Sequence, residues 1–246
     1  MSYATEDIKP YDAGRGKTEQ VKEMFDSIAP AYDFMNRAMT FGIDRRWRAI
    51  AVKEIAKSRP ASILDIATGT GDLALLLHRH IPTARIIGLD LSANMLEKAR
   101  LKAAEAGIDA EQVQFEQGDS LNMRFADDSF DAITVAYGVR NFEHIDRGYA
   151  EMLRVLRPGG TLCVIELSVP ANPIARLGYN IYTRGIIPLI GRLVSHDRRA
   201  YSYLPESIAA VPQREAMTAI MTAAGFANAR FRSLTLGVCT LYFATK

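Results

Sequence analysis

The chain has 246 residues, of which 48% are hydrophobic and 24% charged, proportions that are ordinary for a globular protein. Its 30 basic and 28 acidic residues give a net charge of +2, which excludes the strong basic excess of a nucleic-acid-binding surface. Cys163 and Cys239 lie far apart in sequence and form no metal-binding spacing with the four histidines. The sequence has no secretory apolar region and no run of 18 uncharged apolar residues. We therefore expect a cytoplasmic enzyme or binding domain without a metal ion or a nucleic-acid partner.

The first part of the chain predicts a flexible leader followed by a helical cap. Residues 1–17 are polar and contain several helix-breaking residues, so we expect them to be mobile. From Thr18 onward apolar residues recur at helical spacing until Pro30, and a second helix is predicted over Asp44–Lys57. We interpret residues 18–60 as a helical N-terminal cap.

Residues 61–168 alternate between short apolar runs and helical stretches. This alternation predicts βαβ units, and therefore an α/β domain with a mostly parallel sheet and helices on both faces. A turn at residues 158–160 is expected to precede the last strand. The predicted strands are Ala61–Ile66, Arg85–Leu89, Val113–Glu116, Phe130–Ala136 and Thr161–Leu167.

The last third of the chain has a different pattern. Residues 175–194 are apolar but interrupted, and we interpret residues 169–211 as a helical insert or lid. Residues 212–246 predict a helix followed by two strands that turn at Gly237. Residues 18–246 are accordingly interpreted as one domain.

A glycine loop, Asp65-Ile-Ala-Thr-Gly-Thr-Gly-Asp72, follows the first predicted strand. A Gly-x-Gly turn at the start of a helix lets backbone N–H groups approach a ligand, because glycine has no Cβ. Asp90 ends the next strand, 21 residues after Gly69, where an acid can accept hydrogen bonds from both ribose hydroxyls of an adenosine cofactor. The loop also fits the degenerate dinucleotide pattern GxGxxA through Ala74, so NAD is an alternative cofactor.

Three carboxylates favour S-adenosylmethionine (SAM) over NAD. Asp65 stands at a strand end where a cationic amino acid group would need an acid, and Asp72 would repel a pyrophosphate at the helix start. Asp119 follows the third strand, where it could accept a hydrogen bond from an adenine amino group. SAM is a cation that carries an adenosine and no phosphate, so these acids suit it.

Five motifs, in order, resemble the UbiE/MenG family of SAM-dependent quinol C-methyltransferases over about residues 18–246. The motifs are Tyr32–Trp47 (YDFMNRAMTFGIDRRW), Asp65–Asp72 (DIATGTGD), Tyr137–Asn141 (YGVRN), Arg154–Gly160 (RVLRPGG) and Ser202–Ile208 (SYLPESI). The resemblance implies the class I SAM-methyltransferase (Rossmann-like) fold with a seven-stranded, mostly parallel sheet. Asp44 stands where many members have His, Ala67 replaces the first glycine of the broader methyltransferase loop, and Ala136 stands where a small polar residue is common.

The motifs and the resemblance together define an expected cofactor site. The residues that we expect to bind SAM are Asp65, Thr68, Gly69, Thr70, Gly71, Asp90, Asp119, Ser120 and Ala136.

Methylation of a quinol ring carbon requires a phenolate, and ligands in such sheets bind beyond the carboxyl ends of the strands. Arg140 and Asn141 follow the fourth strand there: a guanidinium stabilises a phenolate, and Asn141 can orient the oxygen. The resemblance points to the same pair and to Tyr32 as catalytic residues. The alternatives are a surface ion pair between Arg140 and Glu143, and a general-base role for His144, which more simply begins the next helix.

The expected reaction is C-methylation of a prenylated quinol, with demethylmenaquinol as the substrate. The 2-polyprenyl-6-methoxy-benzoquinol precursor of ubiquinone, or both rings, is the first alternative; an NAD-linked oxidoreductase and a non-catalytic SAM-binding protein are alternatives of other classes. Residues 172–194 either pack in the core or form a wall for an isoprenoid tail that also touches an anionic membrane. We expect reversible peripheral membrane contact, and a homodimer is compatible with the sequence.

Overall fold

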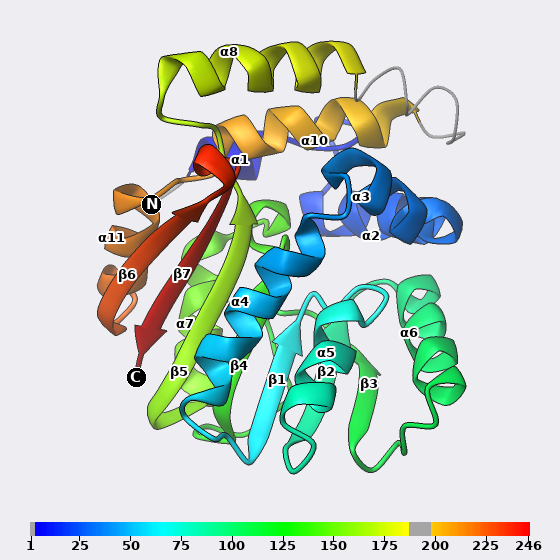
Figure 1. The fold of residues 1–246 in the computed structure, drawn as a ribbon, viewed down its shortest axis with the longest axis vertical. Coiled ribbons are helices and arrows are strands. Elements are labelled where there is room, and N and C mark those ends of the chain that lie inside the picture. Colours follow the sequence, from blue (N-terminus) through cyan, green and yellow to red (C-terminus); the bar gives the residue numbers. More distant parts are fainter. Residues whose placement is uncertain (1–2, 187–197) are drawn as a thin grey trace.

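A seven-stranded sheet lies at the centre of the computed structural model, which describes residues 3–186 and 198–246 (Figure 1). Its strand order is β3-β2-β1-β4-β5-β7-β6, and only β7 runs antiparallel to its neighbours. This order confirms the predicted Rossmann-like sheet, including the C-terminal strand pair. The strands are β1 (Ser62–Ile66), β2 (Arg85–Asp90), β3 (Val113–Gln117), β4 (Phe130–Ala136), β5 (Leu156–Leu167), β6 (Ala227–Leu234) and β7 (Cys239–Thr245).

Helices cover both faces of the sheet and its upper edge (Figure 1). None of the described helices is long and apolar enough to cross a bilayer. The α-helices are α1 (Ala4–Asp7), α2 (Lys17–Ile28), α3 (Tyr32–Thr40), α4 (Asp44–Ala56), α5 (Asp72–His80), α6 (Ala93–Glu105), α7 (Ile145–Val155), α8 (Pro173–Ile181), α10 (Arg198–Ala210) and α11 (Glu215–Ala223). The short helical turns are η1 (Ala29–Ala31), η2 (Val139–Asn141), η3 (Tyr182–Ile186) and η4 (Thr235–Gly237).

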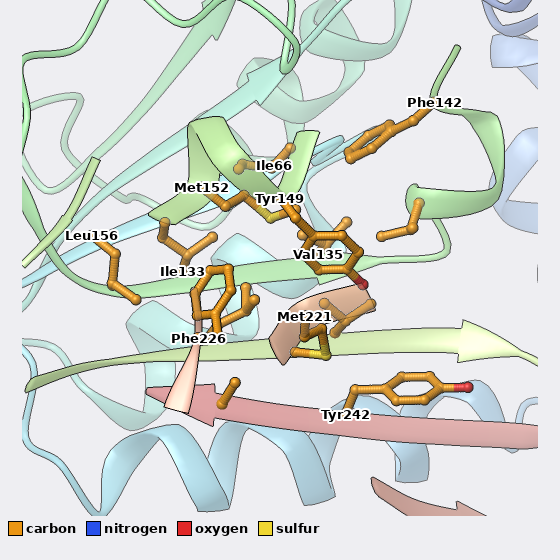
Figure 2. Packing of buried hydrophobic residues seen from close by; sticks show 14 of the residues in the cluster. Ile66, Ile133, Val135, Phe142, Tyr149, Met152, Leu156, Met221, Phe226 and Tyr242 are labelled. Atoms are coloured by element: carbon orange, nitrogen blue, oxygen red, sulfur yellow. The ribbon is translucent and has the colours of Figure 1, made fainter. Parts of the chain in front are cut away.

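The core has one layer on each face of the sheet, because successive strand residues point to opposite sides. On one face, α7 and α11 contribute Tyr149, Met152 and Met221 to a cluster with β4 and β5 (Figure 2). On the other face, α4, α5 and α6 pack through apolar side chains such as Trp47 and Leu96. The sheet is thus buried on both sides, as its near-continuous apolar strands require.

The predicted N-terminal cap of residues 18–60 divides in the structure. Helix α4 lies on the sheet, where its fully buried Val52 and Ile55 join the core. Only α2 and α3 stand above the carboxyl ends of the strands, and they pack against α10 through Met24, Met35 and Tyr203. We use "cap" below for α2, α3 and α10.

The prediction of a mobile leader over residues 1–17 is wrong from Tyr3 onward. Thr5, Glu6 and Lys17 are buried, and the Tyr3 hydroxyl donates a hydrogen bond to Asp146 at the start of α7. Glu6 accepts a hydrogen bond from the Ile145 amide at 2.8 Å. The segment is polar because it satisfies polar groups of the loop before α7, a role that composition alone does not reveal.

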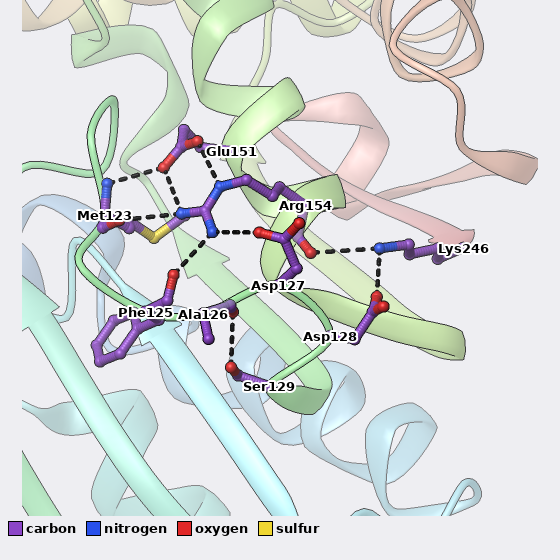
Figure 3. Close-up of polar contacts among 9 residues, drawn as sticks. All are labelled: Met123, Phe125, Ala126, Asp127, Asp128, Ser129, Glu151, Arg154 and Lys246. Carbon is purple, nitrogen blue, oxygen red and sulfur yellow. Dashed lines mark hydrogen bonds and ion pairs between the residues drawn. The ribbon is translucent and has the colours of Figure 1, made fainter.

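The Arg154–Gly160 motif has a structural role away from the strands' carboxyl ends. The Arg154 guanidinium binds the carboxylates of Glu151 and Asp127 and the carbonyl oxygens of Met123 and Phe125, which fixes the loop between β3 and β4 (Figure 3). The turn predicted at residues 158–160 is instead a bulge inside β5, because the pairing with β4 jumps from Leu156 to Thr161.

Two helical glycines provide a matched test of this packing. A Cβ on Gly148 in α7 would lie 2.5 Å from a ring atom of Phe142, whereas one on Gly178 in α8 would meet nothing within 4 Å. We expect Gly148→Ala to destabilise the protein by about 1–3 kcal/mol through overpacking. Gly178→Ala should be neutral or stabilising by up to about 1 kcal/mol, because alanine favours a helix. Urea unfolding of both variants measures the difference; equal free energies of unfolding would contradict it.

Candidate active site

Two adjoining cavities lie beyond the carboxyl ends of β1, β2 and β4, under the cap. The small cavity has a volume of about 60 Å³ and is lined by Gly69, Asp90, Ser120, Ala136 and Asn141, among others. The large cavity has a volume of about 660 Å³ and a mostly apolar lining. Phe25, Tyr32 and Tyr137 line both cavities, so these three side chains stand where the two spaces meet.

The glycine loop adopts left-handed backbone conformations that bring it close to the small cavity. Gly69 and Gly71 have φ values of +57° and +78°, and Ala67 has a φ of +52° although it carries a Cβ. A Cβ on Gly138 would lie 2.7 Å from that of Ala67, so Gly138 makes room for the alanine methyl group. The glycine of the YGVRN motif therefore compensates for the alanine of the loop.

Asp65 is buried under the loop and does not line either of the two cavities. Its two carboxylate oxygens accept hydrogen bonds from Thr134 and Thr68, each at 2.6 Å. Burial raises its pKa to about 6 in spite of these hydrogen bonds. Asp65 thus stabilises the glycine loop through its hydrogen bonds and does not itself line the small cavity.

Asp90 is the acid that reaches the small cavity. It accepts hydrogen bonds from the Gly69 amide at 2.8 Å and from the Ser92 amide at 2.9 Å, so it also holds the loop in place. Burial raises its pKa to about 6, and the two amide donors oppose that rise. A carboxylate so placed can accept further hydrogen bonds from a ligand in the cavity.

The other predicted cofactor residues have different surroundings. Ser120 and Ala136 line the small cavity, whereas the Asp119 carboxylate accepts a hydrogen bond from the Leu121 amide within its own loop. Thr68 bonds Asp65, and the Thr70 hydroxyl donates to Asp33 on α3 at 2.6 Å. Neither threonine lines the two cavities, so their contribution is to shape the loop.

A network of charged groups connects the cap to the glycine loop. Lys102 on α6 forms ion pairs with Asp33 on α3 and Asp72 on α5, and Arg48 on α4 pairs with both Asp72 and Asp44. Burial raises the pKa of Asp72, but Lys102 and Arg48 outweigh it and keep the pKa below its usual value. The repulsion of a pyrophosphate that we expected from Asp72 is therefore weaker than the sequence indicated, because two cations neutralise it.

The cap also closes the small cavity from α2. Asp26 accepts a hydrogen bond from the Ser92 hydroxyl at 2.6 Å, and the Asn94 side chain donates to the Asp26 carbonyl oxygen. A volume of about 60 Å³ is far below the roughly 300 Å³ or more that a ligand site usually offers. Val21, Lys22 and Phe25 of α2 are among the side chains that bound this small space on the cap side.

Arg140 is buried and faces the large cavity, which rules out the surface ion pair with Glu143. Its guanidinium binds Glu166 of β5 at 3.0 Å and the Tyr137 carbonyl oxygen, while its amide donates to the second oxygen of Glu166. Its Nε is a buried group that has no hydrogen-bond partner among the described residues. His144 is exposed and stands at the N-terminal boundary of α7 without a side-chain capping hydrogen bond, which agrees with the expectation that it begins this helix.

Asn141 lines the small cavity, and Tyr32 lies at the junction of the two cavities. The Asn141 side chain donates to the Tyr137 carbonyl oxygen and accepts a hydrogen bond from the Tyr203 hydroxyl of α10. Burial raises the pKa of Tyr32, and the nearby Arg140 charge opposes the rise. The structure therefore brings the three predicted catalytic residues together, although they come from α3 and η2.

Residues that we did not single out also shape this site. Glu166 was hidden in an apolar strand, and a buried acid in a central strand is the signal that could have revealed it. Tyr137 has a φ of +59°, and its buried hydroxyl has no hydrogen-bond partner among the described residues. Asp44, noted above only as a departure from the family pattern, forms a buried ion pair with Arg48 at the wall of the large cavity.

The described part of the 172–194 segment forms one wall of the large cavity. Ala175, Gly178, Tyr179 and Tyr182 of α8 and η3 line it, and residues 187–194 lie outside the described part of the chain.

Among the described residues, no cluster of His, Cys, Asp and Glu has an arrangement that could hold a metal ion.

Comparisons with known proteins agree with this geometry. The chain is 46% identical to the demethylmenaquinone methyltransferase of Bacteroides fragilis over 100% of both chains, and 46% identical to that of Porphyromonas gingivalis over 98% of both. It is 42% identical to the ubiquinone/menaquinone biosynthesis C-methyltransferase UbiE of Geotalea daltonii, over 94% of this chain and 97% of that one.

Solved structures with low sequence identity share the fold. A SAM-dependent methyltransferase from Thermotoga maritima superposes with a TM-score of 0.62 at 18% identity, covering 91% of this chain and 99% of that one. The [4+2]-cyclase SpnF reaches a TM-score of 0.70 at 19% identity, covering 93% and 96%. Because one fold serves different reactions, the family assignment rests on sequence. The model of the ubiE/COQ5 methyltransferase family matches residues 14–246, which confirms the resemblance, and the chain belongs to that family.

Proposed function

We propose that the protein transfers the methyl group of SAM to a ring carbon of demethylmenaquinol, forming menaquinol. The observation that carries this proposal is the junction of the two cavities, where a small cavity lined by the glycine loop and the acid Asp90 meets a large apolar one at Tyr32 and Tyr137. Arg140 lines the large cavity and Asn141 the small one. A methyl group passing from a polar donor to a ring with an apolar tail requires such a boundary.

The small cavity fits the adenosine part of SAM. Asp90 offers carboxylate oxygens to ribose hydroxyls, and the glycine loop offers close backbone approach. Ser120 and Ala136 line the same cavity, and the basic side chain among its described lining residues, Lys22, is paired with Asp26. When bound, SAM supplies an electrophilic methyl group on a sulfonium, and the cation suits the acids around the loop.

The large cavity fits the quinol. A simple phenol has a pKa of about 10, so forming a phenolate at neutral pH requires a nearby positive charge. Arg140 lines the large cavity and supplies that charge. Asn141 orients the oxygen, while Tyr32 closes the junction from the cap. The apolar walls around α3, α4 and α8 take the ring and the start of the isoprenoid tail.

The decisive experiment incubates the pure protein with SAM labelled in its methyl group and with demethylmenaquinol. We expect the label on the ring carbon of the naphthoquinol. The benzoquinol precursor of ubiquinone, offered separately and in competition, tests the alternative ring. Label transfer to neither ring would contradict the proposal.

We propose in addition that the protein docks on an anionic membrane through exposed apolar side chains at the mouth of the large cavity. Phe41 is 83% exposed and Leu236 81% exposed, yet both line the cavity. Helix α8 lies between them: the Phe41 ring is 5.8 Å from that of Tyr182, just after α8, and Gly237 lies beside Pro170, just before it.

The outer side of α8 is apolar and exposed as well. Ile174, Leu177 and Ile181 recur at i, i+3 and i+7, so they share one helix face, and all three are more than half exposed. The exposed Arg37, Arg45 and Arg46 flank Phe41 in the sequence and suit anionic headgroups. A membrane at this surface would deliver the substrate directly from the lipid, where its tail resides.

The first prediction concerns SAM binding. Asp90→Asn keeps the size of the side chain and removes its charge, and we expect at least about a tenfold loss in SAM affinity, since charge-assisted hydrogen bonds contribute roughly 1.5–3 kcal/mol each. With pKa values of about 6, Asp65 and Asp90 become protonated as the pH falls through 6. Wild-type affinity should therefore fall below pH 6, and the Asp90→Asn variant should show a weaker pH dependence. Calorimetry measures both.

Asp128→Asn is the matched control, because Asp128 pairs with Lys246 at the opposite end of the sheet. It should bind SAM like the wild type. Measurable NAD binding, or unchanged SAM affinity in Asp90→Asn, would contradict the cofactor assignment.

The second prediction concerns Arg140. Arg140→Lys keeps a positive charge opposite Glu166 but loses the planar fork, so we expect kcat to fall roughly ten- to a thousandfold with SAM affinity nearly unchanged. Raising the pH should partly restore turnover, because solvent hydroxide can then generate the phenolate.

Arg154→Lys is the control for Arg140→Lys. It removes a guanidinium from an equally rich polar network far from the cavities, and kcat should stay at the wild-type value (Figure 3). If Arg140→Lys weakens SAM binding while turnover at saturation is unchanged, Arg140 belongs to the cofactor site instead.

The third prediction concerns the membrane. The double variant Ile174→Asp, Leu177→Asp places two charges on the exposed face of α8 and should lower retention on anionic liposomes at least about tenfold, because burying such side chains contributes roughly 1.5–3 kcal/mol each. Leu101→Asp, at a 57% exposed position on α6, should not change retention. Equal flotation of the variants, or a dimer that dissociates in the double variant, would assign the surface to something other than lipid.

A further inference from the structure

Lys17 is buried under the catalytic turn. Its side chain has no exposed surface, and its Nζ donates hydrogen bonds to the carbonyl oxygens of Thr5 and Arg140, the latter at 2.9 Å. The Thr5 hydroxyl donates to the same Arg140 carbonyl at 3.1 Å. Two side chains from the N-terminal segment therefore converge on one main-chain oxygen of the residue that faces the substrate cavity.

These contacts complete the support of the η2 turn. Glu166 of β5 holds the Arg140 amide and guanidinium from one side, while Lys17 and Thr5 hold its carbonyl from the other. The turn is a single short helical turn of Val139–Asn141, so its own hydrogen bonds constrain it weakly. A displacement of this backbone would carry the guanidinium with it.

The N-terminal segment, residues 3–18, also forms hydrogen bonds with the chain that follows the η2 turn. The Glu143 carboxylate accepts hydrogen bonds from the Lys17 and Thr18 amides and from the Thr18 hydroxyl, which fixes the start of α2. Glu6 accepts from the Ile145 amide at the start of α7. The segment is therefore attached to the loop both at Arg140 and on either side of His144.

Burying a lysine is costly, so its position requires a reason. Burial lowers the pKa of Lys17 to about 8, and the charge of Arg140 lowers it too, whereas Glu6, Asp7 and Glu143 oppose the shift. An apolar residue would fill the same space without this cost. The ammonium group offers what an apolar residue lacks, namely charge-assisted hydrogen bonds to the Arg140 carbonyl.

We infer that Lys17 is a positioning residue for Arg140, holding the η2 turn so that the guanidinium meets the phenolate oxygen. The inference rests on the proposed function for its kinetic consequence. It assigns the N-terminal segment a part in turnover, although Lys17 lies 123 residues before Arg140 in the chain.

The test compares Lys17→Met with Lys9→Met. Methionine fills the space without donating hydrogen bonds, and Lys9 is the matched control because its Nζ bonds the Ala13 carbonyl within the N-terminal segment. We expect Lys17→Met to lower kcat roughly ten- to a hundredfold, as small misplacements of catalytic groups do, with SAM affinity unchanged. Lys9→Met should behave like the wild type.

The pH profile separates positioning from a general loss of stability. The ratio of wild-type to Lys17→Met kcat should be largest below pH 8 and shrink above it, because the wild-type ammonium then loses its proton and donates more weakly. A ratio of one at all pH values would overturn the inference. So would a constant ratio accompanied by an equal loss of SAM affinity, which marks a structural role only.

A measurement independent of activity completes the design. In protein labelled with ¹⁵N-arginine and saturated with the demethylated product of SAM, the Arg140 Nε–H resonance is identified by its absence in Arg140→Lys. We expect it to shift or broaden in Lys17→Met and to stay in place in Lys9→Met. An unchanged resonance overturns the inference, whereas wild-type protein that methylates no quinol contradicts only the proposed function.

If Lys17→Met does not fold, Thr5→Val removes the other donor to the same carbonyl. It should show the same pattern with a smaller loss in kcat and the same direction of change in the resonance. Wild-type values for both would overturn the inference.

Discussion

The buried ion pair between Arg140 and Glu166 is the interaction on which the site depends. Glu166 lies in a central strand with only 1% of its surface exposed, where an unpaired carboxylate would be strongly unfavourable. The amide and the guanidinium of Arg140 both donate hydrogen bonds to the Glu166 carboxylate. These two bonds fix the position of the turn after β4. The sheet therefore fixes the cation that faces the large cavity, and the rigidity of the core is transmitted to the site.

Around this pair the protein separates two environments. The glycine loop and Asp90 line a small space that contains a carboxylate at the edge of the sheet, while the cap and α8 line a large apolar one. The two meet at a pair of tyrosines, Tyr32 from the cap and Tyr137 from the end of β4. The left-handed backbone of Tyr137 turns the chain sharply there, so that the following residues enter the cavity wall instead of continuing the strand.

The cap is held in place by charges, whereas the sheet is held by apolar packing. Lys102 bridges Asp33 and Asp72, and Asp26 bonds Ser92, so α3 and α2 are attached to the cofactor side by polar contacts that are partly exposed. Partly exposed polar contacts contribute modestly to stability and exchange readily with water. Such contacts separate more easily than an apolar interface of similar area.

The sequence alone was sufficient for the features encoded by neighbouring residues. The strands, the glycine loop and the acid at the end of β2 were predicted because apolar alternation, glycine and helix-start residues act locally. The family was recognised for the same reason, since its motifs are contiguous stretches. The approximate place of Arg140 and Asn141 followed from the rule that parallel strands present their carboxyl ends at one edge.

Only the tertiary structure decided which side chains meet across the chain. Asp65 matches a cofactor motif but is occupied by two threonine hydroxyls, one of them from β4, 69 residues away. Glu166 and Lys17 have no local pattern that marks them, and they gain their roles because Arg140 is folded between them. Residues 1–17 were predicted to be mobile because their polar composition indicates a segment that water can solvate. Composition does not show that backbone amides and carbonyl oxygens elsewhere in the fold need this segment as their hydrogen-bond partner.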